Sequence, residues 1–316
     1  MTVLGPTQFR LDAASWKTVL VMKTGSQRGV GVGEWLLLAV AVSWGLTFFS
    51  TKLLLETLPA TDFLTTRFAI AALVLIAISP KSLRMPKAVL WRGAVLGTVF
   101  AVAQLTQTFG LQHVAASASG FITGLYVVFT PLLGVVLFKA RPRPLLWVAV
   151  LLATAGLAVL SIKPGGGAGF GIGEWQTLAS ALLWGVHITL VGRWSRPQDV
   201  MSLTIVQTSV GAIIFAAGGL RDGLTLPSSG VDWAWMLYFA VVVGAAAEFA
   251  QLWAQARVEA SKAAVLMVTE PLWAALFAVL FGGESVTWRL LAGGGLMIVA
   301  MVLSVRSSNG GVPSLE

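Results

Sequence analysis

Three ionisable side chains, Arg67, Glu248 and Glu270, lie inside long apolar stretches of this 316-residue chain. Charged groups are costly at membrane depth and are typical of pathways that bind or move solutes and ions. The planar donor fork of Arg67 could bind a substrate carboxylate or form a gating ion pair. Glu248 and Glu270 could each carry a coupling proton. Structural roles compete with these: Arg67 could cap a helix end, and Glu270 could cover backbone groups that Pro271 leaves unsatisfied.

Polar residues also repeat on two stretches displaced by 144 residues, where Gln104 corresponds to Glu248 and Gln107 to Gln251. Within each stretch the two residues are three positions apart, which puts them on one face of a helix. We therefore predict that this face lines a cavity. The alternative is interhelical hydrogen bonding, which is worth less than about 1 kcal/mol per bond in membranes.

Aromatic residues and two prolines complete the candidate set. Tryptophan is usually explained by contact with lipid headgroups at the membrane interface, yet several aromatic residues here lie near mid-span. They could form the walls of a substrate site, although helix packing is the commoner role. Pro131 and Pro271 should bend their helices and are hinge candidates. The candidate wall residues are Trp44, Phe49, Tyr126, Trp184, His187, Trp253 and Trp273.

The elements that position these residues follow from composition: 57% of residues are apolar, 11% are charged, and the mean hydropathy is +0.85. A water-soluble protein needs more surface charge. A helix needs about 20 apolar residues to cross the hydrocarbon core of a bilayer. Continuous apolar runs predict helices and not barrel strands. Ten such runs occur, at 33–55, 60–79, 89–111, 117–138, 144–162, 174–194, 200–219, 233–256, 261–281 and 287–305.

The ten runs form two copies of one unit. GEWLLLAVAVSWG at 33–45 and GEWQTLASALLWG at 173–185 share eight of thirteen residues, including glutamate and tryptophan in register. The same displacement of 140 residues carries Arg67 onto Gln207 and Pro131 onto Pro271. Such internal similarity indicates a repeat. Each copy contributes five helices.

The distribution of lysine and arginine sets the topology, because cytoplasmic loops carry the excess of these residues. The even-numbered connections and both tails carry sixteen of the 21 basic residues, whereas the opposite side carries Lys52, Lys163, Arg221 and Arg289. Both termini are thus expected in the cytoplasm. Since five is odd, the second copy must be inverted. We predict an all-α membrane protein with ten transmembrane helices, arranged as a 5+5 inverted-topology repeat around a central cavity.

The expected organisation has five parts. A cytoplasmic basic tail at 1–32, which lacks the apolar core of a signal peptide, precedes the first five-helix repeat at 33–162. A Gly-rich linker at 163–173 leads to the second repeat at 174–305, and a C-terminal tail covers 306–316.

Enzymatic chemistry is disfavoured because the chain has no cysteine and two histidines, His113 and His187. Neither a metal cluster nor a Cys-His pair can be built, and no phosphate-binding GxxxxGK[ST] loop occurs. We expect no enzyme activity, no metal and no cofactor. The net charge of +8 is explained by topology, so nucleic-acid binding is not expected.

Three blocks resemble the drug/metabolite transporter superfamily in its EamA-type ten-helix branch. They are WGLTFFSTK at 44–52, TTRFAIAALVL at 65–75 and TEPLWAALFAVLFGGESVTWRLLAGGGLMIVAMVL at 269–303, and the resemblance covers residues 33–305. It implies export of small metabolites, notably amino acids, from a cavity between the halves, and suggests a prokaryotic inner membrane. The halves are chemically unequal, since Thr130-Pro131 and Lys139 stand where the second half has Glu270-Pro271 and Glu284.

We therefore predict a secondary transporter that works as a monomer in the bilayer and exports amino acids or similar metabolites by alternating access. Three alternatives remain. Efflux of cationic drugs would use Glu248 or Glu270 to bind the cation. Nucleotide-sugar exchange would need several basic groups in the cavity. A scaffold that does not transport would have a sealed centre with Arg67 paired to Glu248.

Overall fold

The computed structural model describes residues 31–138, 143–162, 170–220, 223–258, 263 and 266–308. The chain divides into Met1–Val32 and a second unit, Gly33–Glu316, which holds the helical residues from 33 on. Predictions for residues 1–30, Lys139, the first part of the linker at 163–169 and the tail at 309–316 lie outside the described residues.

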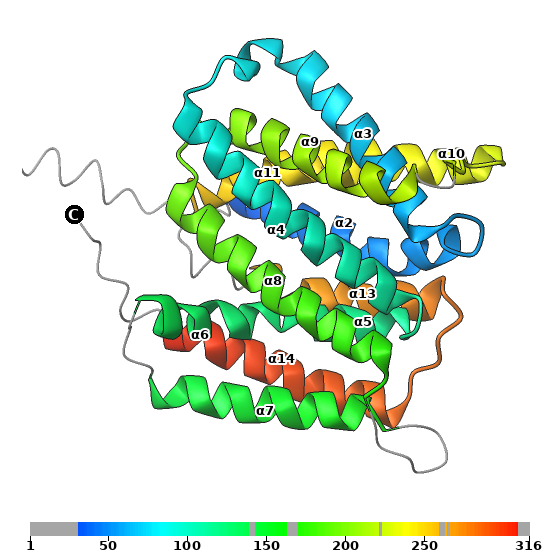
Figure 1. Cartoon of the computed structure of the whole chain (residues 1–316). Helices are drawn as coiled ribbons and strands as arrows, with labels where there is room; N and C mark the ends of the chain where they lie inside the picture. Colours follow the sequence, from blue (N-terminus) through cyan, green and yellow to red (C-terminus); the bar gives the residue numbers. More distant parts are fainter. Residues whose placement is uncertain are drawn as a thin grey trace, which may run out of the picture. The chain divides into compact units, whose positions relative to one another are not determined.

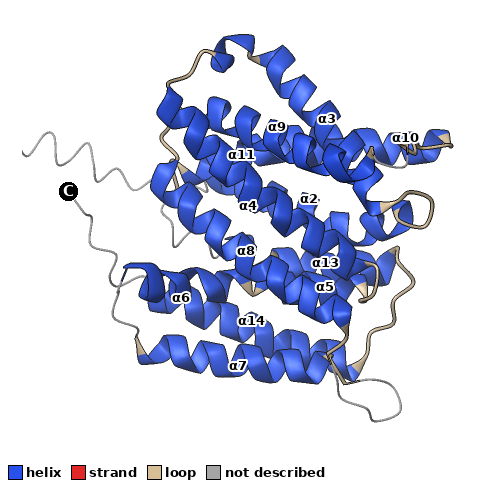
Figure 2. Ribbon diagram, in the orientation of Figure 1, coloured by secondary structure: helices blue, strands red, loops and turns tan. Residues whose placement is uncertain are grey.

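The described residues form helices joined by turns and loops, and none of them belongs to a strand (Figure 2). In chain order (Figure 1) the elements are α2 (Val32–Leu54), α3 (Ala60–Ile78), η1 (Pro80–Leu83), α4 (Lys87–Leu111), α5 (Ala116–Gly124), α6 (Tyr126–Phe138), α7 (Pro144–Leu160), α8 (Ile172–Trp194), α9 (Val200–Gly219), α10 (Gly230–Leu237), η2 (Tyr238–Ala247), α11 (Glu248–Gln255), α13 (Glu270–Leu280) and α14 (Trp288–Ser308).

Seven helical segments of the described residues are long and apolar enough to cross a membrane. Two shorter apolar helices, α7 and α13, accompany them. Helix is the expected form because a backbone in lipid must satisfy its own hydrogen bonds. The prediction of an all-α, multi-pass membrane protein is therefore confirmed. The seven segments are Val32–Leu54, Ala60–Ile78, Lys87–Leu111, Ala116–Val136, Val200–Gly219, Gly230–Gln255 and Trp288–Ser307.

The fourth predicted stretch is interrupted at Leu125, between α5 and α6. Six residues later, Pro131 lies inside α6. A proline has no N–H, so the carbonyl of Val127, four residues earlier, loses its helical donor. The Ser304 hydroxyl of α14 donates to that carbonyl at 3.0 Å. The last helix of the chain therefore satisfies the backbone group that Pro131 leaves free.

The eighth stretch contains a π-helical segment, η2, between α10 and α11. Its turns are closed by i→i+5 hydrogen bonds, a rare geometry that is often found at functional sites. Phe239 of η2 packs edge-on against Phe63 of α3, with ring centroids 5.1 Å apart. The segment ends at Ala247, directly before Glu248.

Glycines allow the closest helix contacts, as is common in membrane proteins. A Cβ atom at Gly45 of α2 would lie 2.5 Å from Trp273 Cβ and 2.9 Å from Ala274 N of α13. At the repeat-related Gly185 of α8, a Cβ atom would lie 3.1 Å from Phe129 Cβ of α6. In each half, the glycine of the WG pair therefore lies against a helix of the other half.

The carboxylate of Glu284, in the loop after α13, caps the start of α5. It accepts hydrogen bonds from Ala116 N at 2.6 Å, from Ser117 N at 3.3 Å and from the Ser117 hydroxyl. The first N–H groups of a helix have no partner within the helix, and an anion there is stabilised by the helix dipole.

We expect Glu284→Ala to lower the free energy of unfolding by about 1–2 kcal/mol, because it removes this cap. The measurement is thermal unfolding of the purified chain in detergent. Glu56→Ala is the matched control, since Glu56 is exposed. Equal melting temperatures for the two variants would contradict the capping role.

Candidate substrate site

A cavity of about 50 Å³ lies where residues of both halves of the sequence meet. A buried water needs about 10–15 Å³ of such space, so the cavity has room for several waters. Its lining mixes charged, amide, hydroxyl and aromatic side chains: Trp44, Thr47, Phe48, Thr51, Arg67, Gln104, Gln107, Thr108, Leu111, Thr123, Tyr126, Trp184, Ile188, Val243, Glu248 and Glu270.

Most of the predicted site residues meet in this cavity. Those that line it are Trp44, Arg67, Gln104, Gln107, Tyr126, Trp184, Glu248 and Glu270. His187 and Gln251 are buried, and Trp273 is half-buried; these three do not belong to the lining. Pro131 lies inside α6, whereas Pro271 occupies the first turn of α13, where a proline breaks no helical hydrogen bond.

Arg67, the eighth residue of α3, is 5% exposed. Its guanidinium carbon lies 4.7 Å from the ring centroid of Phe68, 5.0 Å from that of Phe239 and 5.9 Å from that of Phe63. Guanidinium groups stack favourably on aromatic faces. Arg67 also interacts electrostatically with Glu248. Its Nε atom is buried and has no hydrogen-bond partner among the described residues. The cavity is therefore lined by a guanidinium group whose hydrogen-bonding capacity is not fully used by the described residues.

Glu248 is held by a chain of buried polar groups. Gln207 Nε2 donates to Glu248 Oε2 at 3.1 Å, and Gln207 Oε1 lies 2.9 Å from His187 Nε2. Because the amide oxygen can only accept, His187 carries its proton on Nε2. His187 is therefore linked to Glu248 through Gln207 and does not belong to the cavity lining. Gln207 is a site residue that the sequence does not mark, although the repeat matches it to Arg67.

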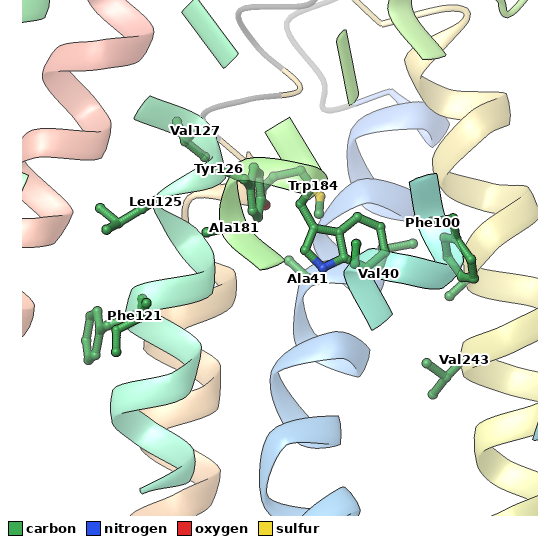
Figure 3. Close-up of a cluster of buried hydrophobic side chains, with 14 of the residues drawn as sticks. Val40, Ala41, Phe100, Phe121, Leu125, Tyr126, Val127, Ala181, Trp184 and Val243 are labelled. Carbon is green, nitrogen blue, oxygen red and sulfur yellow. The ribbon is translucent and has the colours of Figure 1, made fainter. Parts of the chain in front are cut away.

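A second polar cluster lies where α6 and α13 begin. The hydroxyl of Tyr126, the first residue of α6, donates to Glu270 Oε2 at 3.1 Å, and Glu270 is the first residue of α13. Nearby, Trp184 Nε1 donates to Gln107 Oε1 and Gln107 Nε2 donates to Thr123 Oγ1, both at 3.3 Å. Tyr126 and Trp184 lie in one group of buried side chains, with Trp184 between Tyr126 and Phe100 (Figure 3).

The lining also includes residues that the sequence did not single out, notably the hydroxyl groups of Thr47, Thr51, Thr108 and Thr123. Single threonines in apolar helices give no pattern that marks them as lining. Among the described residues, no group of three histidine, aspartate or glutamate side chains could hold a metal ion. The chemistry available is recognition of charged, polar and aromatic parts of a small molecule.

Comparison with known proteins agrees with this arrangement. The model of the EamA-like transporter family matches residues 31–162 and 171–306. An uncharacterized transporter of Archaeoglobus fulgidus is 28% identical over 299 residues, which cover 93% of each chain. A crystal structure of a protein superposes with a TM-score of 0.64 over 85% of this chain and 94% of the other, at 18% identity, which is a similarity of fold. Both segments of the family match include cavity residues, and together they span most of the sequence, so the chain belongs to the EamA-like transporter family.

Proposed function

We propose that the chain exports small amphipathic metabolites, amino acids in particular, from the cytoplasm by alternating access between two inverted five-helix halves. The observation that carries this proposal is the cavity, which brings Arg67, Glu248 and Glu270 together from both halves. An amino acid presents a carboxylate, an ammonium group and a side chain. The cavity offers a guanidinium donor, carboxylate acceptors and the aromatic rings of Trp44 and Trp184, one complement for each part.

The packing of the helices supports the inverted repeat with ten transmembrane helices. Under the repeat, α9 corresponds to α3, and α14 corresponds to α7. Each of these helices packs against its own counterpart, α3 on α9 and α7 on α14 (Figure 1). A two-fold axis in the membrane plane produces such self-paired contacts. The two segments matched by the family model also correspond closely to the two proposed repeats.

The small size of the cavity supports alternating access. Ligand sites for small molecules commonly measure about 300–1,000 Å³, whereas this cavity measures about 50 Å³. A solute could enter only if helices move. The break at Leu125 lies beside Pro271, since a Cβ atom at Gly124 would be 2.5 Å from Pro271 Cγ. We propose hinges here and at Pro131, close to the Tyr126–Glu270 hydrogen bond.

One specific observation favours a second candidate, the efflux of organic cations. The cavity holds two carboxylates and one guanidinium, and Trp44, Tyr126 and Trp184 present aromatic rings that attract cations. In that case Glu248 or Glu270 binds the cation. Nucleotide-sugar exchange lacks such support. It would need several basic groups, and Arg67 is the single basic residue among the described residues that line the cavity.

The proposed cellular setting follows from the basic loops and the single-chain cavity. We place the chain in the inner membrane of a prokaryote with both termini in the cytoplasm. Since one chain supplies the whole lining, we propose that it works as a monomer that binds its solute and the surrounding lipid.

Counterflow in proteoliposomes tests the proposal. Proteoliposomes that contain the native chain are loaded with unlabelled amino acids and offered labelled ones, with quaternary ammonium compounds and nucleotide sugars as competitors. Flux of a labelled quaternary ammonium compound is measured in parallel. We expect saturable amino-acid exchange. If no amino acid is exchanged but cations are transported, amino-acid export is wrong and cation efflux is established.

A further inference from the structure

The two carboxylates of the cavity have different surroundings. Glu248 interacts electrostatically with Arg67 and accepts a hydrogen bond from Gln207. Glu270 accepts a hydrogen bond from the Tyr126 hydroxyl, and no hydrogen bond from a charged group to Glu270 is found among the described residues. Glu248 therefore has a counter-charge within the protein, whereas Glu270 is paired with a neutral phenol.

We propose that Glu270 binds the ammonium group of the substrate and that Tyr126 positions its carboxylate. This inference rests on the proposed function, in that it assigns a part of the same cavity to one part of the substrate. A carboxylate has about four acceptor positions, and the Tyr126 hydroxyl occupies one of them. Glu270 thus keeps the capacity to accept hydrogen bonds from an ammonium group that enters the cavity.

The fold brings the starts of two helices together at this site. Tyr126 begins α6 after the interruption at Leu125, and Glu270 begins α13. Transporters commonly build substrate sites at such discontinuous helices. Pro271 fixes the start of α13 next to Gly124, so the two helix starts are held together by packing as well as by the hydrogen bond.

The other end of the substrate is indicated by a separate observation. Arg67 is 5% exposed, lines the same cavity, and has a buried Nε atom without a hydrogen-bond partner among the described residues. A carboxylate is the group that suits an unpaired guanidinium donor. The substrate class is therefore a molecule with both a free ammonium group and a carboxylate, and acylation of the nitrogen should prevent recognition.

The contacts to the ammonium group and to the carboxylate can be tested separately. The measurement is how strongly unlabelled competitors inhibit counterflow of tritiated L-phenylalanine. The competitors are unlabelled L-phenylalanine, 3-phenylpropionate, which lacks the ammonium group, and phenethylamine, which lacks the carboxylate. In the native chain, 3-phenylpropionate should compete about 10- to 100-fold more weakly than phenylalanine, the size expected for a charge-assisted hydrogen bond. In Glu270→Gln this ratio should fall below about 3-fold.

Two variants make the result specific. Glu248→Gln changes the other carboxylate of the cavity and should keep the native ratio. Tyr126→Phe keeps the ring and Glu270 but removes the positioning hydrogen bond. The ratio should therefore decrease by a factor of about 3 to 10 relative to the native chain. The competition ratio of Tyr126→Phe also tests the assignment if Glu270→Gln is not monodisperse in size-exclusion chromatography. A native ratio in folded Glu270→Gln would overturn the assignment, and so would a native ratio in Tyr126→Phe if Glu270→Gln is not monodisperse.

A different result would contradict the proposed function. If the native chain moves no amino acid but moves labelled phenethylamine, amino-acid export is wrong, and loss of phenethylamine flux in Glu270→Gln would still support the ammonium site. Unchanged phenethylamine flux in that variant would overturn the site as well. The absence of flux of both compounds in the native chain would overturn both proposals.

Discussion

Arg67→Gln is expected to lower kcat/KM for amino-acid exchange by at least about 30-fold, since truncating one partner of a buried charge pair costs about 2–5 kcal/mol. Two effects act together. The substrate carboxylate loses the donor whose Nε is unpaired among the described residues, and Glu248 loses its counter-charge. The measurement is initial-rate counterflow over a range of substrate concentrations.

A structural explanation must be separated from the loss of a contact, because an uncompensated buried charge also destabilises the fold. The double variant Arg67→Gln/Glu248→Gln removes both charges and keeps two polar side chains of similar size. It should melt at a higher temperature than Arg67→Gln and still lack exchange. Exchange restored in the double variant would show that Arg67 serves only to neutralise Glu248, and carboxylate recognition would be wrong.

Gly45→Val is expected to reduce stability by about 3 kcal/mol or more and to prevent the recovery of monodisperse protein. The new Cβ would lie 2.5 Å from Trp273 Cβ and 2.9 Å from the backbone nitrogen of Ala274. A backbone atom cannot move aside as the end of a side chain can. Helices α2 and α13 would have to separate, and both contribute residues to the cavity. Yield and melting temperature in detergent measure the effect.

Gly295→Val is the matched control for this change. Gly295 is an exposed glycine within α14, and a Cβ atom there has nothing within 4 Å. Valine at either site brings the same β-branched side chain into a helix, so any difference between the two variants reports the close contact at Gly45. Similar yields and melting temperatures would contradict the packing argument.

Much of the fold was predictable, because lipid allows few solutions. A run of about 20 apolar residues must form a helix, whatever its neighbours are. The described parts of all ten predicted stretches contain helix. The interruption at Leu125 and the π-helical segment Tyr238–Ala247 were not predicted. Both depend on contacts with other helices, and neither leaves a signature in apolar residues such as those of YFAVVVGAAA.

The site residues that could be predicted from the sequence are those whose burial in an apolar helix is energetically costly. Arg67, Glu248 and Glu270 were found because a charge in an apolar run needs an explanation, and all three line the cavity. Partnerships could not be predicted. Tyr126 meets Glu270 across 144 positions of sequence, and Gln207 links Glu248 to His187. Helix periodicity gives the face of a residue along one helix and says nothing about which helix it faces.

The π-helical segment before Glu248 has a consequence for how insertions and deletions act on this chain. A turn closed by i→i+5 bonds contains more residues than an α-helical turn. The ten residues of η2 therefore change the direction in which the side chains of α11 point, compared with a continuous α-helix. Removing one residue other than Val243, which lines the cavity, would let this segment tighten and would rotate Glu248 and Gln251 together, although neither residue is replaced. The segment therefore works as a spacer whose length sets the direction of the carboxylate.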